Sequence, residues 1–216
     1  HFGRPQDVAF LPDGRILIAD GLDNNRIMIM DNDMNYLGEF GSFGPGPGQT
    51  NTIHAVAIGP DGLVFVLDRA GGRVNVFRTT DNPTEFEFVR AIGELTLPLD
   101  IIVNENDFWI TDLGPLRFIN YDFEGNLKYT WLVPRELPDG YLEVHTISVD
   151  SDGNLYVSGR YSEIATFDST TLTSNSQGTP SCCLQDIFIA KSIDLPSSDI
   201  DGDGWNHSTE LDCGTD

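Results

Sequence analysis

The chain has 216 residues and a formal net charge of −22, from 34 acidic and 12 basic side chains. This charge repels a phosphate backbone and an anionic membrane surface, which argues against nucleic acid and lipid as partners. Hydrophobic residues make up 39% of the chain, enough for a packed core, and no apolar run reaches the roughly 18 residues of a membrane helix. Bound cations would relieve the self-repulsion, so calcium is an early expectation.

An internal repeat organises the first 168 residues. Asp-Gly or Asn-Asp pairs, each followed by a short apolar run, recur every 44 to 48 residues, at Asp13, Asp61, Asn106 and Asp152. A fixed period of this length indicates one structural unit used several times.

Each copy predicts the same succession of short strands. An apolar strand comes first, a turn leads to a second strand, a polar loop to a third, and a fourth strand lies outermost. The first strands are predicted at 8–10, 56–58, 101–103 and 147–149, second strands at 16–19 and 64–67, third strands at 26–30, 73–77, 117–121 and 164–167, and fourth strands at 36–40, 86–92 and 128–132.

Four strands per repeat are typical of the blades of a β-propeller. A two-sheet sandwich is the alternative, but it gives no reason for a fixed period. We therefore predict an all-β propeller with four visible blades, at about 1–48, 49–94, 95–140 and 141–168.

Two of these copies resemble a known repeat family. The stretch from Pro5 to Asp20, followed by Asn25-Arg26-Ile27, looks like an NHL repeat, and so does the stretch from Ile53 to Arg69. The arrangement is similar to that of peptidylglycine α-amidating lyase and its bacterial relatives. The resemblance implies a six-bladed NHL propeller, two further blades before His1, and zinc-dependent cleavage of peptidyl-α-hydroxyglycine into a peptide amide and glyoxylate.

The same resemblance assigns roles to individual residues. His54 and His145 match zinc-ligand histidines of the family, and Arg69 matches its catalytic arginine. Leu22 stands where the family has a catalytic tyrosine, and Thr146 stands where it has an aspartate. The alternatives are that the histidines pack in the central channel and that Arg69 forms an ion pair between blades.

Position within the repeat supports a shared site. Equivalent places in different blades converge near a propeller axis, so His54 and His145 could bind one zinc ion. Arg160 occupies the repeat position of Arg69, and Arg69 could neutralise a carboxylate or a developing oxyanion. Aspartates that recur at the ends of second strands are expected to cap turns: Asp20, Asp68 and Asp112.

The segment 169–193 is predicted to be a linker with one possible closing strand, and 194–216 is predicted to bind calcium. Its twelve-residue pattern places hard oxygen ligands, a glycine at position six and a bidentate glutamate at position twelve. It is similar to thrombospondin type 3 and EF-hand loops, and the alternative is a solvated acidic tail. The expected calcium residues are Asp199, Asp201, Asp203, Trp205 through its carbonyl, His207 and Glu210.

Two functions follow from the sequence. The first is an extracellular, calcium-binding NHL propeller that serves as a binding or structural module of a secreted or cell-surface assembly, with other protein chains or a peptide as partners. The alternative is a zinc-dependent amidating-lyase-like enzyme. All three cysteines lie late in the chain, and a bridge from Cys182 or Cys183 to Cys213 would suit an oxidising compartment.

Overall fold

The computed structural model describes residues 1–132, 141–150, 155–162, 164–167, 170–173, 186–192 and 209–210. Within these ranges the regular elements are strands, apart from one short 3-10 turn, Pro60–Gly62. No helix there is long and apolar enough to cross a membrane. The predicted all-β class is confirmed.

Three four-stranded antiparallel sheets follow one another, each with its strands in chain order. Glycines at positive φ, such as Gly14 at 93° and Gly62 at 72°, allow the tight turns between first and second strands. The strands are β1 (Asp7–Phe10), β2 (Ile16–Asp20), β3 (Arg26–Met30), β4 (Tyr36–Phe40), β5 (Ile53–Ile58), β6 (Leu63–Asp68), β7 (Arg73–Thr79), β8 (Phe86–Ile92), β9 (Pro98–Val103), β10 (Asp107–Asp112), β11 (Arg117–Asp122) and β12 (Leu127–Leu132).

The fourth sheet departs from the prediction. Its order is β13 (Tyr141–Val149), β14 (Leu155–Ser162), β17 (Asp186–Ser192) and β18 (Thr209–Glu210). The predicted third strand at 164–167 was wrong for this sheet, because β15 (Ile164–Phe167) pairs with β16 (Thr170–Thr173) in a separate hairpin. That hairpin satisfies the backbone of β15 and leaves the edge of β14 to β17, whose seven residues all pair with it.

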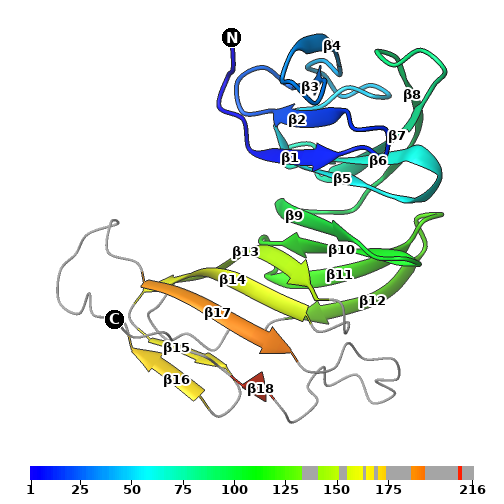
Figure 1. Ribbon diagram of the computed structural model, residues 1–216. Coiled ribbons are helices and arrows are strands. Elements are labelled where there is room, and N and C mark those ends of the chain that lie inside the picture. Colours follow the sequence, from blue (N-terminus) through cyan, green and yellow to red (C-terminus); the bar gives the residue numbers. More distant parts are fainter. Residues whose placement is uncertain are drawn as a thin grey trace.

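The sheets pack face to face through apolar side chains, in the manner of propeller blades. One buried cluster joins the first and second blades, another the second and third, and a third cluster the third and fourth. Figure 1 shows the blades following one another along an arc, with the outer strands β8 and β12 on its right-hand side. Phe65 and Phe108, both fully buried with ring centroids 5.0 Å apart, lie at the centre of the second interface.

An aspartate at the end of each second strand closes the first three blades. Asp68, whose side chain is completely buried, accepts hydrogen bonds from the Asn51 and Gly71 amides and pairs with Arg73 at 3.2 Å. Asp20 and Asp112 make the same kinds of contact. Each accepts a backbone amide from the segment just before its own blade and pairs with the arginine that begins the third strand. The expected capping role of these aspartates is confirmed.

Candidate functional site

The site is built at a β-bulge that recurs near the start of the first strand of three blades. The register between β5 and β6 shifts between Ile53 and Ala55, so His54 is the extra residue. The same shift leaves Leu99 extra in β9 and His145 extra in β13. A bulge turns one side chain out of the regular alternation, which is a common way to aim a residue at a functional site.

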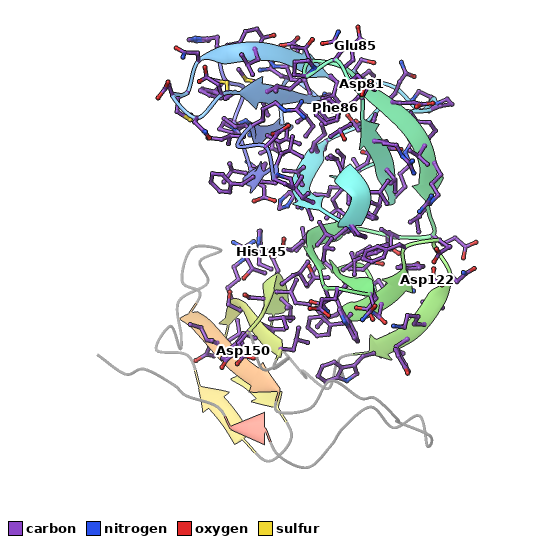
Figure 2. All side chains as sticks on the ribbon, turned by 45° about the vertical axis from the view of Figure 1, so that its right-hand side comes forward. Asp81, Glu85, Phe86, Asp122, His145 and Asp150 are labelled. Atoms are coloured by element: carbon purple, nitrogen blue, oxygen red, sulfur yellow. The ribbon has the colours of Figure 1, made fainter. Side chains whose placement is uncertain are left out.

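The bulges bring the two predicted histidines together. The His54 and His145 rings lie 5.4 Å apart between centroids, although 91 positions separate them in the chain. His54 Nδ1 lies 2.6 Å from the carbonyl oxygen of Leu99. In Figure 2, His145 of the fourth blade lies on the left-hand, inner side of the arc, whereas Asp122 of the third blade lies on the right-hand side.

The contacts of His54 fix its protonation. A carbonyl oxygen only accepts, so Nδ1 must carry the proton and donate it to Leu99, which leaves the lone pair on Nε2. Burial lowers the pKa of His54, and the positive charge of Arg69 adds to this effect. His54 is therefore a neutral imidazole near pH 7, in the tautomer that metal-bound histidines adopt when a carbonyl orients them.

The equivalent arginines of the second and fourth blades differ in their partners. Arg160 donates to Glu143 Oε2 at 2.8 Å, and Glu143 Oε1 also lies 3.8 Å from His145 Nε2. Thr52 takes the place of Glu143 in the second blade, so no carboxylate stands opposite Arg69 there. Among the described residues Arg69 forms no ion pair, and its buried Nε has no hydrogen-bond partner. The expected ion pair of Arg69 between blades is not found within that part of the chain.

The backbone beside His54 is tightly constrained. Thr52 has a φ of 103°, a strained value for a β-branched residue, and its carbonyl accepts the Arg69 amide at 2.9 Å. The neighbouring blade approaches so closely that a Cβ on Gly21 would lie 1.8 Å from the Ile53 carbonyl oxygen. These contacts hold the start of β5 in one place and with it the ring of His54.

Carboxylates alternate with the histidines around this end of the fold. Asp7 and Asp100 follow the bulge position in the first and third blades, where Ala55 and Thr146 stand in the second and fourth. Asp7 Oδ2 accepts the Val56 amide at 2.9 Å, and Asp100 Oδ2 accepts the Ile147 amide at 2.9 Å. Each carboxylate thus ties its blade to the next.

Burial raises the pKa of Asp100 to about 6, and the nearby charge of Asp7 contributes in the same direction. Burial also raises the pKa of Asp7. Their equivalent positions in the repeat could have revealed both residues from the sequence. Glu143 could not have been found in this way, because its role depends on a cross-strand pairing.

The structure leaves the metal predictions open. Among the described residues no group of three or more His, Cys, Asp or Glu side chains could hold a metal ion. Glu210 lies in β18, where its backbone is the strand partner of Lys191 in β17. The three cysteines lie outside the described ranges. So do the other predicted calcium residues, which are Asp199, Asp201, Asp203, Trp205 and His207.

Comparison with known proteins agrees with the fold described above. Residues 2–29 match the NHL repeat family, over the first three strands of the first blade. The periplasmic gluconolactonase of Pseudomonas aeruginosa superposes with a TM-score of 0.58 at 15% identity, over 80% of this chain and 58% of that one. The fold is a β-propeller. Virginiamycin B lyase from Staphylococcus aureus gives a TM-score of 0.54 at 16% identity, over 80% of this chain and 55% of that one.

A putative 6-phosphogluconolactonase from Bacteroides uniformis is also similar, with a TM-score of 0.53 at 19% identity over 77% of this chain and 55% of that one. The propeller described here thus spans little more than half the length of these solved structures. Identities of this size establish the shared fold, and the NHL match identifies the kind of repeat in the first blade.

Proposed function

We propose that this NHL-type propeller is a binding module that takes an anionic ligand at the end of the fold where His54, Arg69 and His145 meet. The observation that carries the proposal is the contrast between the two equivalent arginines. Arg160 is neutralised by Glu143, whereas Arg69 has no carboxylate partner among the described residues. A ligand carboxylate would supply the missing charge.

Electrostatics favours a small, specific anion at this point. The chain as a whole carries −22, so a general attraction for anions is excluded and only a local positive group can bind one. The Nε–H of Arg69 is buried without a partner, and a buried donor left unpaired costs free energy that an accepting ligand would recover. The neutral His54 beside it adds no charge, and its Nε2 lone pair can accept a hydrogen bond from the ligand.

We expect Arg69→Gln to weaken the binding of peptides with a free C-terminal carboxylate by about 30-fold or more, as is usual when one partner of a desolvated charge pair is removed. The same peptides with amidated C-termini are the probe for the carboxylate itself. Calorimetry would measure both series. Arg160→Gln is the matched control, because that guanidinium is already paired with Glu143. Equal losses in both variants, or equal binding of acid and amide peptides, would contradict the proposal.

A zinc-dependent enzyme of the amidating-lyase type is the second candidate. It is supported by the tautomer and neutrality of His54 and by the 5.4 Å separation of its ring from that of His145. Two imidazoles would supply two of the three protein ligands that a catalytic zinc site commonly has. Bound zinc would act as a Lewis acid and lower the pKa of its water. The superposed structures include a lyase and lactonases.

This candidate predicts one zinc ion per chain and release of glyoxylate from a peptidyl-α-hydroxyglycine. His54→Ala should lower both, because it removes the imidazole that Leu99 orients. Metal analysis and a glyoxylate assay are the measurements. The enzyme reading should be dropped if zinc is absent and His54→Ala changes neither readout.

We further propose that the module acts outside the cell, in a secreted or surface assembly, and that 194–216 binds calcium there. The support is the spacing of oxygen ligands in the sequence. Calorimetric titration should show calcium binding that Glu210→Ala abolishes, because the bidentate ligand is lost. Glu124→Ala, in the turn after β11, removes the same charge elsewhere and should leave binding intact. Unchanged titration of Glu210→Ala would rule the loop out.

A further inference from the structure

One repeat position decides how many positive charges the candidate site offers. It is the residue directly after the end of the second strand's aspartate position, and Arg69 occupies it in the second blade. Gly21 and Leu113 hold it in the first and third blades, and Arg160 follows Gly159 at the equivalent place in the fourth. Two of the four described blades therefore bring a guanidinium to the end of the fold where the two histidines lie.

One of these two positive charges is already neutralised within the protein. The strand register sets Glu143 directly opposite Arg160, and Glu143 Oε2 accepts hydrogen bonds from the Nε and one terminal nitrogen of this arginine, at 3.2 and 2.8 Å. The Glu143 side chain is 5% exposed and the Arg160 side chain is 49% exposed. The guanidinium thus lies over a buried carboxylate that holds it through two donors and cancels its charge.

Glu143 and Arg69 act on the same imidazole. Glu143 Oε1 lies 3.8 Å from His145 Nε2, and the His145 ring lies 5.4 Å from that of His54. Burial, the largest influence, lowers the pKa of His54; the charge of Arg69 also lowers it, whereas the charge of Glu143 raises it. A ligand bound beside His54 would therefore interact with the positive charge of Arg69 and with the negative charge of Glu143.

Further negative charge lies at this end of the fold. Asp100 follows Leu99, whose carbonyl oxygen accepts the Nδ1 proton of His54, and the Asp100 carboxylate accepts the Ile147 amide of the fourth blade. Burial raises the pKa of Asp100, and the nearby charge of Asp7 raises it further. A second negative charge on a ligand would be repelled by these carboxylates as well as by Glu143.

We infer that Glu143 is the specificity-determining residue of this site, and that it restricts the ligand to one with a single carboxylate. The inference rests on the proposed function, because it requires Arg69 to bind the carboxylate of the ligand. With Arg160 neutralised, the described part of the site offers the guanidinium of Arg69, which matches one negative charge. A dicarboxylate or a doubly charged phosphate would place its second charge among like charges, which disfavours it relative to a monocarboxylate.

Two peptides that differ in one group test this restriction. Acetyl-alanyl-asparagine carries only its C-terminal carboxylate, and acetyl-alanyl-aspartate has the same shape with a second one. Calorimetry of the wild-type chain near neutral pH should give an affinity for the aspartate peptide about 10-fold or more below that for the asparagine peptide, because a like charge is brought close. Equal affinities would overturn the inference and leave the proposed function intact. Binding of neither peptide would overturn both.

Glu143→Gln separates specificity from a structural role. Glutamine keeps the shape of the side chain and removes its charge, so Arg160 loses its carboxylate partner, and the aspartate peptide should bind about 10-fold or more tightly than it binds the wild type. In Glu143→Gln/Arg160→Gln both charges are absent, and the preference for the asparagine peptide should return. Glu124→Gln, in the exposed turn after β11, is the matched control and should bind both peptides as the wild type does. Loss of both peptides in Glu143→Gln, or an unchanged ratio of their affinities, would refute the assignment.

Discussion

Replacing Asp68 with alanine is expected to lower the free energy of unfolding by about 3–5 kcal/mol, the usual cost of removing one partner from a buried ion pair. The carboxylate is completely buried, accepts the Asn51 and Gly71 amides, and pairs with an Arg73 side chain that is only 19% exposed. Its removal leaves two backbone amides without their acceptor and the Nε of Arg73 without its carboxylate partner. It also frees the loop that leads into β5 and so into His54.

Urea denaturation of the 216-residue chain, followed by tryptophan fluorescence, would measure this loss. Asp13→Ala is the matched control, because Asp13 also pairs with an arginine but its side chain is 52% exposed. An exposed pair contributes at most about 1 kcal/mol, so this variant should unfold nearly as the wild type does. A loss for Asp68→Ala no larger than that for Asp13→Ala would show that the buried contacts of Asp68 do not hold the blade together.

The stability of the protein is expected to depend on pH through Asp100 in an unusual direction. Burial raises the pKa of Asp100 in the folded state to about 6, above its ordinary value of 3.8. The folded state therefore binds the proton first, so this group favours folding more and more as the pH falls from about 7 to about 4. A rise from 3.8 to about 6 corresponds to about 3 kcal/mol.

Asp100→Asn should remove this contribution, so the difference in unfolding free energy between variant and wild type should change by about 3 kcal/mol between pH 7 and pH 4. In asparagine an NH2 group replaces one of the two oxygens that accept the Ile101 and Ile147 amides, so one of these amides loses its acceptor. That cost is the same at every pH. Urea midpoints at several pH values would give the difference. A difference that stays constant from pH 7 to pH 4 would contradict a raised pKa for Asp100.

His54 acts in the opposite direction over part of the same range. Its pKa is lowered by burial, so the unfolded state takes up the proton first as the pH falls below about 6.5. The contribution of His54 to stability is therefore present above that pH and is lost on acidification. His54 is present in both the wild type and Asp100→Asn. Its contribution therefore cancels in the difference between their unfolding free energies, which reports Asp100 alone.

Much of the fold could be predicted from the sequence. The period of 44 to 48 residues and the short apolar runs place the strands of the first three blades, because each strand repeats the same alternation and the same turn chemistry. The repeat also predicts that His54 and His145 approach each other, since equivalent positions of different blades converge at the same end of the fold. The structure bears this out with rings 5.4 Å apart.

The fourth blade shows where the period fails as a guide. The run at 164–167 has strand-forming residues at the expected distance, yet β17 pairs with β14 in its place. Local propensity cannot decide between two strands that could both extend an edge. That choice depends on which pairing satisfies more backbone groups once the whole chain is folded.

The sequence by itself determined the blade repeat, the aspartates that close the first three blades, and the shared position of the two histidines. Only the tertiary structure decided that Glu143 neutralises Arg160 while Arg69 has Thr52 opposite it, and that Leu99 sets the tautomer of His54. The reason is physical. A repeat fixes where each backbone position lies, but the charge state and availability of a side chain depend on what neighbouring strands and blades place within hydrogen-bonding distance.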